Sequence, residues 1–139
     1  MKALVFPMFA ILGLVACSTN RISDTDRLAV YMAHSGAPVK QIRYYHAMGW
    51  DRIDGEHVLL EMRPKERWLL KLSGPCLDWG SGSPVLSLSS PTGWVMAKFD
   101  RVHIHGSQVT CRIEEIRPVD ARAVRAAEEA RRAQASAGT

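Results

Sequence analysis

The sequence lacks the long apolar run that a membrane-spanning helix requires. Crossing a bilayer takes about 20 consecutive apolar residues, whereas the uncharged, mostly apolar stretch near the N-terminus covers only residues 3–16. Cysteine is scarce as well, with three in 139 residues, and no Cys-x-x-Cys motif is present. These absences argue against a permanent transmembrane helix and against the commonest redox and zinc motifs. The charged fraction of 23% and the apolar fraction of 47% indicate a globular chain of about one domain.

Residues 1–16 have the pattern of a secretory signal peptide. Lys2 supplies a short positive n-region, and residues 3–16 match the usual length of the apolar h-region. Pro7 would also weaken a permanent membrane helix. We therefore expect this segment to direct export and to be removed.

The signal ends in a motif for lipid attachment. Residues 14–17 read Leu-Val-Ala-Cys and resemble the bacterial lipobox, in which the cysteine thiolate accepts a diacylglyceryl group and a small residue precedes it. The motif predicts a lipoprotein with two or three acyl chains, such as palmitate, on Cys17, which is enough for stable anchoring. Ser18 stands where an Asp would commonly retain the protein in the inner membrane, so the periplasmic face of the outer membrane is favoured. The alternatives are an ordinary signal peptide with an incidental cysteine, or a buried apolar helix.

Cys76 and Cys111 are the two cysteines left for the mature chain. Because the periplasm is oxidising, an even pair in a small exported domain predicts a disulfide. Closing the loop from residue 76 to residue 111 would stabilise the fold by roughly 4 kcal/mol. The alternatives are a redox-active pair or two metal ligands, but neither cysteine has a histidine at the usual metal-ligand spacing.

We expect four segments along the chain. They are the signal peptide (1–16), the lipidated cysteine with a tether and a short helix (17–37), a β-domain with the disulfide (38–119) and a helical tail rich in Ala, Arg and Glu (120–139).

Two helices are predicted from capping residues and apolar spacing. Ser23 or Thr25 can cap the first helix, which carries an apolar stripe of Leu28, Tyr31 and Met32. Asp120 can cap the second, whose helix formers continue to Gln134. Apart from Val124, the second helix offers little but alanine for packing, so we expect it to project or pack weakly, with residues 135–139 disordered.

Between the helices the pattern predicts short antiparallel strands. The expected strands cover residues 39–46, 50–53, 56–62, 68–72, 85–88, 94–104 (with a bend near Asp100) and 108–116. Asp54-Gly55 predicts a two-residue hairpin, residues 63–66 form the next turn, and Pro118 is expected to end the last pairing. This arrangement predicts a mainly β fold, a small antiparallel barrel or a strongly curled sheet.

Three segments resemble a family of small proteobacterial envelope proteins of unknown function. They are residues 72–76 (Leu-Ser-Gly-Pro-Cys), 99–102 (Phe-Asp-Arg-Val) and 111–120 (Cys-Arg-Ile-Glu-Glu-Ile-Arg-Pro-Val-Asp). The resemblance covers about residues 38–125 and implies an export signal followed by a β-rich domain. It implies no catalytic or ligand-binding residue. The two matching cysteines support the pairing of Cys76 with Cys111.

His103 and His105 are candidate ligand-binding residues. They are two positions apart on a predicted strand, so their rings would face the same side, and His46 or His57 would have to complete a metal site. The favoured interpretation is a half-exposed strand face without a metal, because the nearest carboxylate, Asp100, would face the opposite side.

Trp79 is the other candidate binding residue, because it lies in the glycine- and serine-rich loop 77–84 and should be exposed. Trp68 and Trp94, on predicted strands, are expected in the core. The loop residues 80–83 (Gly-Ser-Gly-Ser) have neither the spacing of a nucleophile elbow nor the lysine of a phosphate loop.

The net charge of +4 comes from interleaved charges, which indicates a solvated surface and no nucleic-acid partner. The leading hypothesis is a non-enzymatic lipoprotein, held to the lipid bilayer by acylated Cys17 and contacting an envelope protein or an anionic envelope component. No metal and no other cofactor is predicted. The alternatives are a small-ligand or metal-binding module built on Trp79, His103 and His105, or an enzyme acting on cell-wall material.

Overall fold

The computed structural model describes residues 22–77 and 86–138. Cys17 with the rest of the lipobox, Trp79 and residues 80–83 lie outside the described residues. The elements in chain order are α1 (Asp24–Ala33), β1 (Gln41–Arg43), β2 (Gly49–Arg52), β3 (His57–Arg63), β4 (Glu66–Leu72), β5 (Leu86–Leu88), β6 (Trp94–Met96), β7 (Arg101–Ile104), β8 (Thr110–Val119) and α2 (Ala121–Ala137).

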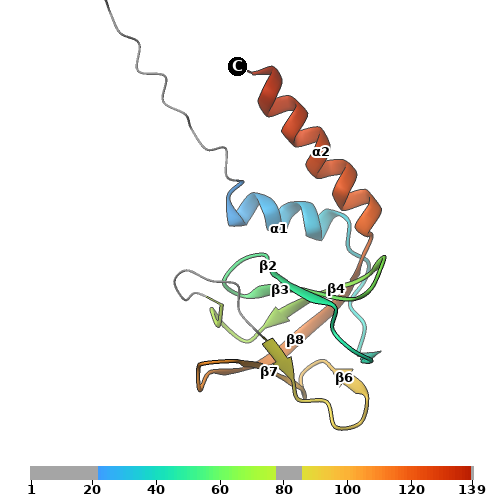
Figure 1. Ribbon diagram of the computed structural model, residues 1–139, viewed down its shortest axis with the longest axis vertical. Helices are drawn as coiled ribbons and strands as arrows, with labels where there is room; N and C mark the ends of the chain where they lie inside the picture. The colour runs from blue at the N-terminus through green and yellow to red at the C-terminus, as the bar shows by residue number, and fades with distance from the viewer. Residues whose placement is uncertain (1–21, 78–85, 139) are drawn as a thin grey trace, which may run out of the picture.

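Six strands form one antiparallel sheet in the order β2-β3-β4-β8-β7-β5, and β1 pairs with β6 in a separate two-stranded sheet. The larger sheet curls into a nearly closed barrel, with both helices on one side of it (Figure 1). The mainly β, barrel-like fold with an N-terminal and a C-terminal helix is therefore confirmed.

Strand β4 faces two separate apolar cores, because successive side chains of a strand point to opposite faces. Leu70 is fully buried inside the barrel. Leu69 is buried on the outer face, together with Tyr31 of α1 and Val124 of α2. The second core therefore attaches the helices to the barrel wall.

The helix caps agree with the sequence. Ser23 caps α1, and the carboxylate of Asp120 accepts hydrogen bonds from the amides of Arg122 and Ala123 at the start of α2.

Helix α2 continues to Ala137, so the expected disorder of residues 135–137 is wrong. The alanine-rich sequence has a high helix propensity and extends the helix. Val124 is the buried residue of this helix, and α2 extends away from the sheet (Figure 1), as expected for so few apolar side chains.

Residues 94–104 form two strands rather than the one long strand, bent near Asp100, that the sequence indicated. Lys98 has a φ of 70°, and the carboxylate of Asp100 accepts a hydrogen bond from the amide of Met96 (2.6 Å). The chain therefore turns between β6 and β7, and the two strands join different sheets. Val95 is fully buried, so the neighbouring Trp94 points outward and is 38% exposed; its expected place in the core is wrong. Trp68 is half-buried against the barrel core.

Pro118 lies within β8, so the expectation that it ends the pairing is wrong. Its carbonyl accepts a hydrogen bond from the amide of Gly36 (2.9 Å), so its ring nitrogen also faces the segment at Gly36 and away from β4. No bond of the β4–β8 ladder needs an N–H at this position, and Pro118 pairs with Trp68 of β4.

Of two turns predicted in the β-domain, one is confirmed and the other is longer than expected. The turn at residues 63–66 is present, with Arg63 paired to Glu66 and Lys65 at a φ of 74°. The hairpin at Asp54-Gly55 is longer than two residues, because Arg52 pairs with Val58. The carboxylate of Asp54 closes this longer loop through its bonds to backbone amides.

The structure joins Cys76 and Cys111 in the disulfide expected from the sequence, with their Cα atoms 6.4 Å apart. The bond ties the segment after β4 to β8, and the amide of Ser73 donates to the carbonyl of Arg112 beside it (2.9 Å). Within the described ranges, neither helix is both long and apolar enough to cross a bilayer.

Candidate functional site

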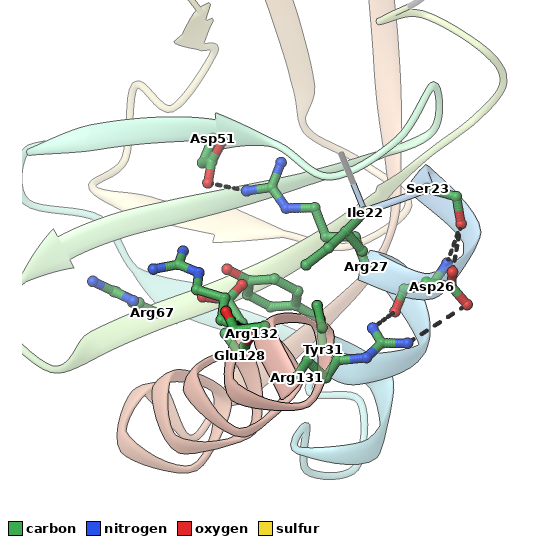
Figure 2. A pocket seen from close by; sticks show the side chains of 12 residues that line it. Ile22, Ser23, Asp26, Arg27, Tyr31, Asp51, Arg67, Glu128, Arg131 and Arg132 are labelled. Atoms are coloured by element: carbon green, nitrogen blue, oxygen red, sulfur yellow. Dashed lines mark hydrogen bonds and ion pairs between the residues drawn. The ribbon is translucent and has the colours of Figure 1, made fainter. Parts of the chain in front are cut away.

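A cleft of about 1220 Å³ opens between α1, α2 and the outer face of the sheet (Figure 2). Helix α1 lines it with its first turns, and α2 lines it with its C-terminal half. Its charged side chains are Asp26, Arg27, Asp51, Arg67, Glu128, Arg131 and Arg132. Four arginines and three acids therefore face one cavity.

Ion pairs connect the walls of this cleft. Arg131 of α2 lies 3.6 Å from the carboxylate of Asp26 and donates to its backbone carbonyl (3.2 Å). Arg27 of α1 pairs with the carboxylate of Asp51 and donates to the carbonyl of Arg52 (2.6 Å). These bonds link α2 to α1 and α1 to β2, so the cleft is held by polar contacts as well as by the second core.

Tyr31 projects from α1 between these charged walls and is 4% exposed. Burial raises the pKa of its phenol, and the negative charge of Glu128 raises it further, against a smaller opposing effect of Arg27. The hydroxyl therefore stays protonated at neutral pH and can donate a hydrogen bond.

Arg67 and Arg132 are the cleft arginines whose side chains leave hydrogen-bond donors without a partner among the described residues. The Nε atom of Arg67 is buried, lies 3.4 Å from the carboxylate of Glu61 and lacks a hydrogen-bond partner among the described residues. The guanidinium of Arg132 lines the cleft and forms no ion pair within the described part of the chain. Free guanidinium donors recognise carboxylate, phosphate and carbonyl oxygens, so the cleft is suited to binding a polar or acidic group.

Sequence reasoning missed this cleft, because its residues come from four segments that are distant along the chain. The available signal was weak: the arginines of the tail lie on one helix with a single buried valine, Val124. Nothing in the sequence alone places Asp51 or Arg67 opposite them.

The histidines singled out from the sequence lie away from the cleft. His103 is exposed on β7 and pairs with Ser87 and Thr110, and His105 is exposed in the turn that follows. His46 is exposed as well. Among the described residues no three His, Cys, Asp or Glu side chains gather as a metal site would require.

His57, the fourth histidine considered as a metal ligand, contacts the carboxylate of Asp54. Its Nδ1 atom lies 2.9 Å from Oδ1 of Asp54, and the same carboxylate accepts hydrogen bonds from the amides of Glu56 (2.8 Å) and His57 (2.7 Å). Burial raises the pKa of Asp54, but these hydrogen bonds and the His57 charge outweigh it, and the net pKa is lowered. The charged carboxylate therefore closes the β2–β3 loop.

The lowered pKa of Asp54 predicts that the stability of the fold depends on pH. The pKa of Asp54 is lower in the folded chain than in the unfolded chain. The contribution of Asp54 to the free energy of unfolding is therefore complete above its unfolded pKa and is lost as pH falls through its folded pKa. We expect the Asp54→Asn variant to be less stable than the wild type at pH 7, and the difference to shrink on acidification to about pH 2. Urea unfolding across this range measures it, with Glu129→Gln on α2 as the control. A difference that stays constant with pH would contradict the assignment.

Among known protein families, the model of a family of unknown function (DUF6491) matches residues 1–135 of the chain. No curated protein and no solved structure matches it. The match agrees with the expectation of a family without an assigned function, and it brings no site residues with it.

Proposed function

Because the chain belongs to DUF6491, a family of unknown function, we propose its role from its own residues. It is a lipoprotein of the outer membrane that faces the periplasm. Its β-domain is a non-enzymatic interaction or accessory domain of the cell envelope.

The observation that carries this proposal is the Leu-Val-Ala-Cys motif at the end of an apolar N-terminal segment. The Cys76–Cys111 disulfide supports it, because such bonds persist in oxidising compartments. Ser18 directly after Cys17 favours the outer membrane over the inner one.

The position of the cleft supports an interaction role near the membrane. Cys17 and Ile22 are five positions apart, so an extended chain would span about 18 Å at most between them. Ile22 lies on the rim of the cleft. With Cys17 acylated, the cleft would lie close to the bilayer, where its arginines can meet an acidic envelope protein or an anionic headgroup.

The Cys17→Ser variant tests the proposal. Cells are fed an alkyne analogue of palmitate, and the immunoprecipitated protein is examined for label. We expect the wild type to carry the label and to sediment with membranes, and the variant to carry none, because serine offers no thiolate for acyl transfer.

Cys76→Ser is the matched control, since it also replaces one cysteine sulfur atom by oxygen, and it should retain the label. Label on Cys17→Ser, or an unlabelled wild type in the soluble fraction, would overturn the proposal.

A further inference from the structure

A second surface, away from the cleft, combines arginine and aromatic side chains. The Cζ atom of Arg43 lies 5.6 Å from the ring centroids of both Tyr45 and Trp94. The Cζ atom of Arg63 lies 4.3 Å from the centroid of Tyr45. Tyr45 is 53% exposed, so this set, which we name the arginine–aromatic cluster, lies at the surface.

The two-stranded sheet brings three of these residues together. Arg43 on β1 is the direct cross-strand partner of Trp94 on β6. Tyr45 follows Arg43 by two positions, and the amide of Tyr44 continues the pairing by donating to the carbonyl of Gly93 (2.9 Å). In extended backbone, residues two apart share a face, so the backbone places Tyr45 and Trp94 on the same side as Arg43.

The guanidinium of Arg43 has ring contacts but no hydrogen bond or ion pair within the part of the chain that the structure describes. Arg63 has one acidic neighbour, Glu66, at 3.8 Å, and the Arg63 side chain is 59% exposed, so the pair is weak. Ring contacts occupy guanidinium faces and leave the N–H edges available. The cluster therefore contains two guanidinium groups that are held by ring contacts and have N–H donors available to a ligand.

The local charge is positive. Lys65 lies exposed in the turn that connects Arg63 to Glu66, so a third cationic side chain directly follows Arg63 and Pro64 along the chain. A ligand with anionic oxygens would gain charge-assisted hydrogen bonds from Arg43 without displacing an existing partner.

We propose that Arg43 and Arg63, supported by Tyr45 and Trp94, form a binding site for an anionic ligand that carries phosphate or carboxylate groups. The two guanidinium groups contact the same tyrosine ring, which suits a ligand with two anionic groups. None of the four residues lines the cleft, and the site does not depend on lipid attachment at Cys17.

The test follows the Nε–Hε NMR signals of the arginines in the full-length protein in detergent. One titration uses pyrophosphate and a second uses glutarate, each against sodium chloride of matched ionic strength. We expect saturable shifts of the Arg43 and Arg63 signals in at least one titration, and the titration that saturates identifies phosphate or carboxylate as the preferred group.

Three variants define the site. Arg43→Gln should weaken binding by about tenfold or more, because it removes a charged donor. Tyr45→Leu keeps both charges but removes the shared ring, and should weaken binding about two- to fivefold. Arg101→Gln, an exposed arginine on β7, is the control and should bind like the wild type.

Thermal unfolding of each variant confirms that the exposed substitutions leave the fold intact. Shifts no larger than those in sodium chloride would overturn the proposal. Equal weakening by Arg43→Gln and Arg101→Gln would overturn it too, since that result would indicate attraction by net charge alone.

Discussion

Replacing both disulfide cysteines, Cys76→Ala with Cys111→Ala, is expected to lower the free energy of unfolding by about 4 kcal/mol. The bond closes the loop between residues 76 and 111, and opening that loop returns conformational entropy to the unfolded chain. A small domain is stable by only about 5–15 kcal/mol, so this loss is a large share of the total. Urea unfolding of the wild type and the double variant measures it.

The wild type under reducing conditions is the matched control, because it loses the bond and keeps both sulfur atoms. Cys111 is buried in the barrel core, so a loss seen in the variant but not on reduction would come from packing. Equal stability of the oxidised and reduced wild type would contradict a structural role of the bond.

The sequence predicted those elements that depend on near neighbours along the chain. Ser23 and Asp120 cap the two helices through their own side chains, and the turn at residues 63–66 follows from proline at its second position. The mainly β class follows in the same way from strand alternation and turn residues.

Features that depend on distant partners were missed. Whether Pro118 interrupts a strand depends on which neighbour its nitrogen faces, and that neighbour, Gly36, is far away in sequence. The turn at Lys98 forms because Val95 and Val102 are both buried while their strands join different sheets. The cleft and the arginine–aromatic cluster likewise arise only when separate segments meet.

The Leu70→Ala variant is expected to lose about 3 kcal/mol of unfolding free energy. Leu70 is fully buried on β4, which pairs with β3 on one side and β8 on the other. Removing its side chain leaves a cavity that strands paired on both sides cannot close by moving together. Urea unfolding gives the value.

Leu88→Ala supplies the comparison for this variant. Leu88 ends β5 at the edge of the sheet and is only half-buried, so the same chemical change should cost less than it does at Leu70. Equal losses at the two positions would contradict the assignment of Leu70 to the centre of the barrel core.

Intact mass spectrometry of the protein purified from membranes, with and without reduction, tests the lipid anchor and the disulfide together. We expect a chain that begins at acylated Cys17 and gains the mass of two hydrogen atoms on reduction, as the Cys76–Cys111 bond opens. A chain that begins at Met1, carries no acyl group and has free thiols would contradict both the lipid anchor and the export on which the proposed function depends.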